Sequence, residues 1–318
     1  MEIDLPVFYK LGLVGYPLGH SLSPSIHHAC LLECELQGEY CLYPIPPSQE
    51  TSSRLRELTG KVRSGELRGL NITIPYKQAI IPYLDRLTPT ASAIGAVNTL
   101  YAVEGQLIGD NTDAPGFYSD LQTRLLEVAG CSRAIVLGAG GSARAVVYAL
   151  LQAGWEVTVA ARRLSQAQDL ISNLQQEAAQ PPPSEQAYPP PASITEAIGL
   201  SQDSLSRYLS QAARHDQDPL LIVNTTPLGM APETATTPWP SAIPFPSRAM
   251  LYDLVYNPAE TVLLETARSQ GIPSVNGLGM LVEQAALSFE LWTGYQPPRG
   301  AIYAAIPGQI QTYNSGAR

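Results

Sequence analysis

A glycine-rich turn is the first feature of this sequence that could do chemistry. Its residues are Gly138, Ala139, Gly140, Gly141, Ser142 and Ala143, which fit the pattern G-x-G-x-x-[G/A]. They directly follow the apolar run AIVL (134–137) and open a helix-prone stretch that ends at about Ala153. Bare backbone in such a turn can approach a pyrophosphate at the helix N-terminus. The sequence therefore predicts a nucleotide site here, against the alternative of an ordinary βα turn without a ligand.

The end of the next strand indicates which nucleotide is bound. The strand EVTVAA (156–161) leads into Ala161-Arg162-Arg163, where an NAD-binding unit would carry an acidic residue for the ribose hydroxyls. A guanidinium can instead pair with a 2′-phosphate, and each charge-assisted hydrogen bond contributes about 1.5–3 kcal/mol. We therefore expect NADP(H) rather than NAD, with Arg162 as the stronger candidate. The alternative is that both arginines belong to a solvated loop.

Polar residues at the ends of predicted strands form a second candidate site. Lys77 closes the segment NITIPYK, and Asp113 closes DNTD. A ketone reduced by hydride leaves an alkoxide that needs a proton, and general acid catalysis contributes about 10²–10⁴-fold. Lys77 is the candidate acid, and Asp113 could orient its ammonium group, although a lysine without such a partner is usually a solvated charge. Because Asp113 favours the charged lysine while burial lowers its pKa, the sequence leaves the sign of that pKa shift open.

Two serines precede a predicted helix near the start of the chain. Ser21 and Ser23 are two residues apart, so in an extended segment they point to the same side. A helix N-terminus favours an anion, and a substrate carboxylate would fit between the two hydroxyls. The alternative is that Ser23 only caps the helix, with Pro24 at its first position.

Composition limits the classes of partner. The chain has 318 residues, 45% of them apolar, which favours two domains, with a cleft between them. The net charge of −9 argues against nucleic acid and anionic membranes, and no apolar run reaches the roughly 18 residues of a spanning helix. The start MEIDLPVFYK lacks the features of a signal peptide. We expect a cytoplasmic protein that binds a small-molecule substrate, as a monomer or a homodimer.

Cysteines and histidines give no sign of a metal site. The four cysteines form no CxxC pair, and Cys30 and Cys34 lie one helical turn apart, as two buried thiols would. His27 and His28 are adjacent and cannot share a helix face. We expect reduced thiols and no metal.

The apolar pattern predicts an α/β fold of two domains, one of them a Rossmann-type nucleotide-binding domain. Strands are expected at 11–15, 69–74, 96–102, 106–109, 134–137, 156–161, 220–224 and 250–256. Helices are expected at about 23–36, 50–64, 77–87, 144–153, 258–270 and 280–292, with another near the C-terminus. The proline-rich segment 181–191 is expected to be a surface insertion.

The motifs together resemble the shikimate dehydrogenase family over nearly the whole chain. In order they are GYPLGHSLSPSIHH, NITIPYK, GAVNTL, GDNTDAPGF, GAGGSARA, NTTPLGM, DLVYNP and NGLGMLVEQAA. The resemblance implies reversible reduction of 3-dehydroshikimate to shikimate with NADPH, on the route to aromatic amino acids. It also implies a discontinuous substrate domain, 1–113 and 276–318, around an NADP domain at 114–275.

The resemblance assigns roles to particular residues. Lys77 and Asp113 would be the catalytic pair, and Ser21 and Ser23 would hold the substrate carboxylate. The groups around the ring would be Thr73, Lys77, Asn98, Asp113, Tyr256 and Gln284. Besides the glycine turn and residues 161–163, the cofactor would meet Asn224, Thr225, Leu254 and Gly277. Without the resemblance, Tyr256 and Gln284 would be taken as packing or capping groups.

The sequence departs from the family pattern in three places. The family's usual Asn-Arg-Thr after the second cofactor strand is Ala161-Arg162-Arg163 here. Pro89 stands where the family sometimes has an acidic residue, about a dozen positions beyond Lys77, and the proline-rich insertion is not a usual feature. Two alternatives stay open, a quinate/shikimate dehydrogenase and a catalytically silent NADP sensor.

Overall fold

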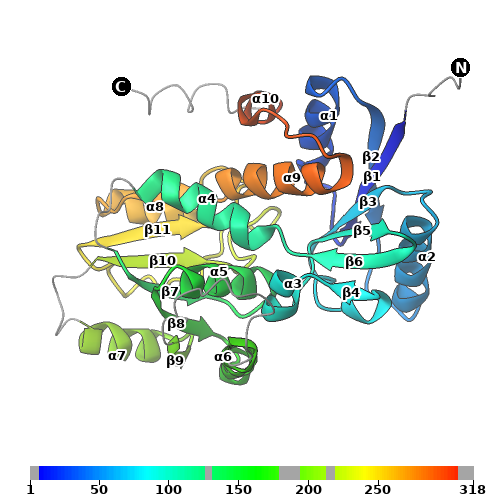
Figure 1. Cartoon of the computed structure of the whole chain (residues 1–318). Coiled ribbons are helices and arrows are strands. Elements are labelled where there is room, and N and C mark those ends of the chain that lie inside the picture. Colours follow the sequence, from blue (N-terminus) through cyan, green and yellow to red (C-terminus); the bar gives the residue numbers. More distant parts are fainter. Residues whose placement is uncertain (1–6, 126–130, 179–193, 213–218, 307–318) are drawn as a thin grey trace, which may run out of the picture. The chain divides into compact units, whose positions relative to one another are not determined.

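The structure is a computed structural model that describes residues 7–125, 131–178, 194–212 and 219–306 (Figure 1). Internal contacts divide the chain into two units. Unit 1 comprises Met1–Ser92, Ala96–Thr112 and Leu281–Arg318, and unit 2 comprises Ala93–Gly95 and Asp113–Met280. Which ligand each unit binds stays a prediction. The proline-rich segment 181–191 lies outside the described residues, and none of the helices in the described part is long and apolar enough to cross a membrane.

Unit 1 is built on a mixed six-stranded sheet, counted over its described residues. The strands are β1 (Phe8–Gly15), β2 (Gln37–Pro44), β3 (Gly69–Ile72), β4 (Arg86–Leu87), β5 (Thr99–Val103) and β6 (Gln106–Asp110), in the order β2-β1-β3-β5-β6-β4. β1 runs parallel to β2 and β3, whereas β5 is antiparallel to both β3 and β6. β2 was not predicted, because as an edge strand it buries only part of its side chains.

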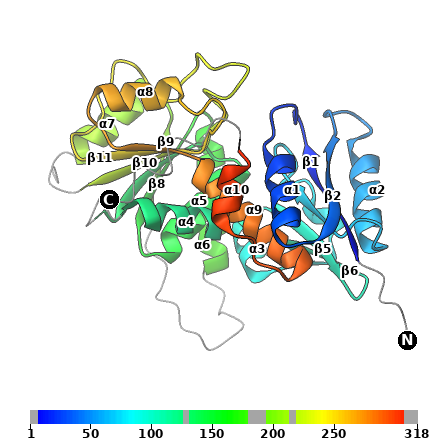
Figure 2. The same ribbon diagram turned by 90° about the horizontal axis from the view of Figure 1, so that it is seen from above.

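Helices cover both faces of this sheet. α2 (Thr51–Arg63) lies on one side, and α1 (Ser23–Glu33) and α9 (Leu278–Thr293) lie on the other (Figure 2). Leu55 and Leu58 of α2 join an apolar cluster with Leu70 and Ile72 of β3. Trp292 of α9 donates its ring N–H to the carbonyl oxygen of Leu100 at 3.2 Å. The remaining helices that start in this unit are η1 (Ile81–Tyr83), α3 (Pro89–Ile94) and α10 (Arg299–Ala304).

Two helix predictions in unit 1 were wrong. The helix expected at 77–87 is only the single 3₁₀ turn η1 followed by β4, since Pro82 has no N–H to donate and Tyr83 and Leu84 bond three residues back rather than four. α1 stops at Glu33 rather than near Leu36. Glu35 there has a φ of +53°, and the N–H of Leu36 bonds to Leu31 O, as in a Schellman motif.

Unit 2 is built on a parallel sheet, six-stranded over the described residues. The strands are β7 (Arg133–Leu137), β8 (Glu156–Ala161), β9 (Ile194–Gly199), β10 (Leu220–Asn224), β11 (Ala249–Asp253) and β12 (Ser274–Asn276), in the order β12-β11-β10-β7-β8-β9. Renumbered within the unit, this is the order 3-2-1-4-5-6 of the doubly wound dinucleotide-binding fold. The predicted α/β class with a Rossmann-type domain is confirmed.

Helices also cover both faces of the sheet in unit 2. α4 (Asp113–Leu125), α5 (Gly141–Gln152) and α6 (Leu164–Ala178) lie on one face, and α7 (Gln202–Ala212) and α8 (Val262–Ser269) lie on the other (Figure 2). β9, α4 and α7 were not predicted. The core between sheet and helices includes Ile135, Leu251 and Leu264, each fully buried.

Candidate active site

The glycine turn joins β7 to α5 and leaves the start of the helix uncovered. Gly140 is the N-cap, with φ −84° and ψ −171°, and no side chain caps the helix. A Cβ added at Gly140 would meet nothing within 4 Å, so packing inside the protein does not require glycine there. Gly138 differs, since its φ is +116° and an added Cβ would lie 2.5 Å from Thr225 Oγ1. Gly138 shapes the turn, whereas Gly140 keeps open the space in front of α5.

The turn lies at the switch point of the sheet, where β7 and β10 are neighbours and their connections leave in opposite directions. Thr225, directly after β10, donates its N–H and its hydroxyl to Leu137 O at 2.9 and 2.7 Å. The structure therefore brings the predicted cofactor residues Gly138 and Thr225 together. Ligands of open α/β sheets bind at this position.

The side chain of Asn224 holds neighbouring segments of unit 2 together through hydrogen bonds. Its side chain is fully buried, and its amide nitrogen donates to Asp253 at 2.8 Å while its amide oxygen accepts from the N–H and hydroxyl of Thr226. Asp253 also accepts from Thr261 Oγ1 at 2.6 Å and from Val255 N at 3.1 Å. Burial raises the pKa of Asp253, and these hydrogen bonds oppose the rise. Asp253 thus ties together the segments that follow β10 and β11.

The segment after β11 carries two further predicted residues. Leu254 donates its N–H to Asn224 O at 2.9 Å, and a Cβ added at Gly277 would lie 2.1 Å from Leu254 O. Glycine at 277 is therefore required by the close approach of the two backbones. Tyr256, in the same segment, is half-buried, and burial raises the pKa of its phenol.

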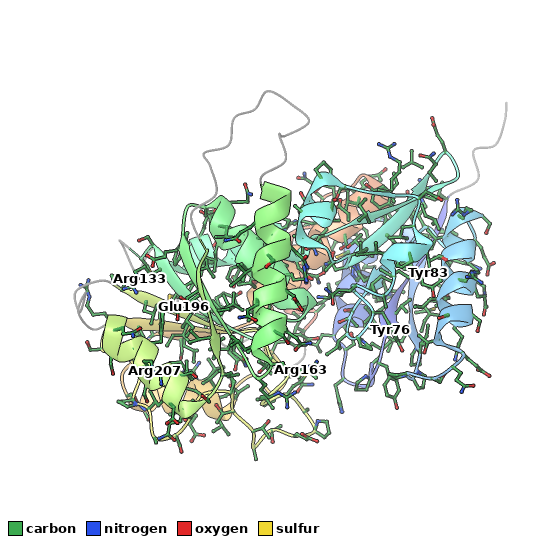
Figure 3. The ribbon with its side chains drawn as sticks, turned by 90° about the horizontal axis from the view of Figure 1, so that it is seen from below. Tyr76, Tyr83, Arg133, Arg163, Glu196 and Arg207 are labelled. Atoms are coloured by element: carbon green, nitrogen blue, oxygen red, sulfur yellow. The ribbon has the colours of Figure 1, made fainter. Side chains whose placement is uncertain are left out.

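Two arginines follow β8 next to the glycine turn. β8 pairs with β7 along its length, while Ala161 is buried and Arg162 and Arg163 are exposed. Figure 3 shows Arg163 at the turn before α6. Neither guanidinium makes an ion pair or side-chain hydrogen bond with any described residue, so both are available to an anion beyond the carboxyl end of β8. This arrangement suits a 2′-phosphate.

Arg144, a buried cation in the first turns of α5, was not predicted. Its side chain donates to Ile94 O at 3.3 Å, and its Nε has no partner among the described residues. Burial lowers the pKa of this guanidinium, and Asp169 opposes that effect. The GAGGSARA motif contains Arg144, but a sequence motif does not indicate burial.

The two serines of unit 1 lie at the start of α1. Ser21 Oγ accepts from Ser23 N at 3.3 Å. The capping alternative for Ser23 was wrong: the N-cap is Leu22, no side chain caps the helix, and Pro24 follows as the second helical residue. Ser23 is buried and Ser21 is half-buried.

The expectation that Cys30 and Cys34 are both buried thiols needs correction. Cys30 is buried, but Cys34 is only partly buried.

Thr73 and Lys77 follow β3. Thr73 donates its N–H to Val14 O at 2.9 Å, and Lys77 accepts at its carbonyl oxygen from Val97 N at 2.7 Å. The backbone of Lys77 is thereby tied to the residue before Asn98. Lys77 belongs to unit 1 and Asp113, a buried residue at the start of α4, to unit 2, so their pairing stays a prediction.

Asn98 and Gln284 come together from distant parts of the chain. Asn98 Nδ2 donates to Gln284 Oε1 at 3.4 Å, and Gln284 Nε2 donates to Leu281 O at 2.9 Å. Three buried hydroxyls surround Asn98, those of Thr99, Thr112 and Ser288. Thr99 and Thr112 were noted only as members of polar clusters. Ser288 was missed, although its spacing of four from Gln284 places both on one helix face.

No group of three or more histidine, cysteine, aspartate or glutamate residues in the described part of the chain could hold a metal ion.

Family comparisons cover both ends of the chain. Residues 13–100 match the model of the shikimate dehydrogenase substrate binding domain, and residues 277–306 match that of the shikimate 5′-dehydrogenase C-terminal domain. The shikimate dehydrogenase (NADP(+)) of Carboxydothermus hydrogenoformans is 38% identical over 295 residues, 93% of this chain and 95% of that protein. That of Symbiobacterium thermophilum is 40% identical over 304 residues, covering 94% and 95%.

Solved structures share the whole fold. A shikimate 5-dehydrogenase from Thermus thermophilus, in complex with NADP(H) and shikimate, has a TM-score of 0.73 and 34% identity, covering 93% of this chain and 98% of that one. A shikimate dehydrogenase in complex with NADP+ has a TM-score of 0.77 and 30% identity, covering 94% of each. A quinate dehydrogenase from Corynebacterium glutamicum, in complex with NAD, has a TM-score of 0.76 and 29% identity, covering 93% and 98%.

Proposed function

This chain belongs to the shikimate dehydrogenase family, and we infer that it catalyses the reversible, NADP-dependent interconversion of shikimate and 3-dehydroshikimate. The observation that carries this inference is the 38–40% identity to NADP-dependent relatives over 93–94% of the chain. We place the reaction in the biosynthesis of aromatic amino acids.

Unit 2 fits the cofactor at three points. The open space in front of Gly140 and the uncapped start of α5 suit a pyrophosphate. The unpaired guanidinium groups of Arg162 and Arg163 suit the 2′-phosphate, and an acid in their place would repel it. Thr225, Leu254 and Gly277 line the switch-point side, where Asn224 acts through its backbone and its bond to Asp253. The cofactor held by these residues would supply hydride chemistry, reducing the ring ketone in one direction and oxidising the alcohol carbon in the other.

Lys77 supplies the proton in this proposal. During reduction its ammonium group donates a proton to the oxygen that becomes the alkoxide, and in the reverse direction the neutral amine takes the proton from the hydroxyl. Asp113 orients the amine. Ser21 and Ser23 bind the substrate carboxylate, and the ring hydroxyls are bound by Thr73, Asn98, Tyr256 and Gln284. A ligand that lacks one hydroxyl would leave a buried polar group unpaired, which provides selectivity.

The test is the absorbance of reduced cofactor when the purified protein meets shikimate with NADP, compared with NAD. We expect rapid NADP reduction, and a Lys77→Ala variant should lose about 10²–10⁴-fold in kcat while still binding NADP. If the protein binds NADP tightly but turns over neither shikimate nor quinate, it is the sensor rather than an enzyme.

The structural similarity to a quinate dehydrogenase makes quinate the necessary second substrate in that assay. Arg162 and Arg163 favour NADP, so we expect shikimate with NADP to be the preferred pair. Equal kcat/KM values for quinate and shikimate would replace this assignment with a quinate/shikimate dehydrogenase.

A further inference from the structure

A closed ring of hydrogen bonds surrounds the side chain of Asn98 within unit 1. Asn98 Nδ2 lies 2.9 Å from Thr112 Oγ1, which lies 3.0 Å from Ser288 Oγ. Ser288 Oγ lies 2.7 Å from Thr99 Oγ1, which lies 3.1 Å from Asn98 Oδ1. All four side chains are buried, with at most 3% of their surface exposed. The ring therefore has no access to bulk water as an alternative partner.

The direction of this ring follows from the donors available. Thr112 N, which can only donate, lies 2.7 Å from the Asn98 side-chain oxygen, so this atom must be Oδ1 and the amide cannot be flipped. Asn98 then donates to Thr112 and accepts from Thr99. A continuous ring needs each hydroxyl to pass its single hydrogen onward, from Thr112 to Ser288 to Thr99. Hydrogen bonds in such a chain polarise and strengthen one another.

A second amide supports the ring from outside. Asn71 Nδ2 lies 3.0 Å from Ser288 Oγ and 3.2 Å from Thr99 Oγ1, and Asn71 Oδ1 accepts from Tyr40 at 2.8 Å. Asn71 is buried and comes from β3. The ring thus joins β3, β5, the segment after β6 and helix α9.

We propose that Thr99, Thr112 and Ser288 are positioning residues that lock the amide of Asn98 in one orientation, with its donor nitrogen turned toward Gln284. This rests on the proposed function, in which Asn98 and Gln284 bind the hydroxyls of the substrate ring. Ser288 Oγ also lies 3.0 Å from Gln284 O, one turn earlier on α9, so the single hydrogen of Ser288 is shared between Thr99 Oγ1 in the ring and this carbonyl oxygen as a three-centre bond. None of the three hydroxyls needs to touch the substrate in this role.

The first test is Thr112→Val, which removes the hydroxyl and keeps the branched shape. We expect the KM for shikimate to rise on the order of tenfold, because the Asn98 donor loses an acceptor that lies 2.9 Å away. The KM for NADP should stay within twofold. Thr112→Ser, which restores the hydroxyl, should return the KM for shikimate to near its original value.

Thr59→Val is the matched control. Thr59 is buried in the same unit and donates only to Arg56 O within α2. The Thr59→Val variant should lower the melting temperature by about as much as Thr112→Val does, without raising the KM for shikimate. A merely structural role for Thr112 would make the two variants alike.

The second test is a double-mutant cycle of Thr112→Val with Ser288→Ala, measured as kcat/KM for shikimate. Because both changes open the same ring, the double variant should lose less than the product of the two single losses. Strictly multiplicative losses would overturn the proposal. So would an unchanged KM in Thr112→Val, or a Thr112→Ser variant as impaired as Thr112→Val.

The activity of the unaltered protein on shikimate distinguishes a failure of the ring proposal from a failure of the proposed function. If this protein turns over shikimate and the variants behave like the control, the ring proposal fails and the proposed function stands. If the parent does not turn over shikimate, the proposed function fails and the role assigned to the ring fails with it.

Discussion

Arg162 and Arg163 present two guanidinium groups just beyond the carboxyl end of β8, where the charge of a single side chain can decide between two cofactors. We expect Arg162→Ala to raise the KM for NADP roughly tenfold. This is the low end of the effect expected from losing a charge-assisted hydrogen bond, because the site is exposed to solvent. The KM for NAD should be unchanged, as NAD has no 2′-phosphate. Steady-state kinetics with both cofactors measures this.

Arg207→Ala on α7 is the control for this substitution, since Arg207 is also exposed and belongs to the same unit (Figure 3). It should leave both KM values unchanged. Equal increases for NADP and NAD in Arg162→Ala would mean that Arg162 does not recognise the 2′-phosphate.

His27 is a buried histidine that the proposed reaction does not use. It stacks on Tyr40 with ring centroids 4.2 Å apart, and neither ring nitrogen has a hydrogen-bond partner among the described residues. Burial lowers its pKa to about 3, although the side chain of Asn71 opposes this effect. The unfolded chain takes up this proton below a pH of about 6.5, whereas the folded protein does not until about pH 3, so stability is lost as the pH falls through this window.

We therefore expect the free energy of unfolding to fall by roughly 2 kcal/mol between pH 7.5 and pH 5 on account of His27 alone. His27→Phe keeps an aromatic ring against Tyr40 and should remove this part of the decline. Urea titrations at the two pH values measure the difference. His28→Gln, at the exposed neighbouring position, should behave as the parent does, and an unaltered slope in His27→Phe would contradict the assignment.

Gly138 and Gly140 belong to one turn but should respond oppositely to alanine. Gly140→Ala should leave the melting temperature nearly unchanged, because the φ of −84° at this residue suits alanine and its surroundings are open. The same substitution should weaken NADP binding tenfold or more, because the added methyl group fills the space before α5. Gly138→Ala should itself destabilise the protein, since its φ is +116° and Thr225 is too close. Thermal melts and NADP titrations distinguish the two. A Gly140→Ala variant that binds NADP normally would contradict this site.

Elements whose signals are local were predictable from the sequence. β8 has the predicted bounds, because a short, mostly apolar and β-branched run between Gly154 and two arginines allows few alternatives. The C-terminus of α1 was not predictable in this way, because Glu35 adopts the left-handed conformation that glycine usually adopts at the end of a helix. The edge strand β2 was also missed, because its pairing with β1 is non-local and its side chains are mostly not buried.

The candidate site likewise contains some residues that local motifs predict and others that they do not. The glycine turn, Lys77 and the arginine pair are carried by short motifs, whereas the ring around Asn98 is made by Ser288 and Thr112, 176 residues apart. Nothing local marks a serine on an apolar helix as one end of a hydrogen-bond network. The network becomes visible only in the folded structure, where these side chains are buried and the hydrogen-bond partners of each are known.

At the scale of the whole molecule, the two units should respond to two different ligands. Unit 2 carries the glycine turn and the arginine pair, and unit 1 carries Ser21, Ser23 and Asn98. A ligand that binds only the folded protein stabilises it by about 2.7 kcal/mol at 100 times its Kd. NADP and shikimate should therefore each raise the melting temperature by several degrees.

The assignment of one ligand to each unit predicts how these shifts separate in variants of the full chain. Gly140→Ala should reduce the shift caused by NADP by about half or more, because tenfold weaker binding at 100 times the original Kd leaves only about 1.4 kcal/mol of stabilisation. It should keep the full shift with shikimate, which at saturating concentration makes its carboxylate contacts at the start of α1. Ser21→Ala combined with Ser23→Ala should do the reverse, since the glycine turn is unaltered. Differential scanning fluorimetry with each ligand alone gives both results. Loss of both shifts in either variant would mean that one unit supplies the essential contacts to both ligands, and the division of binding between the units would then be wrong.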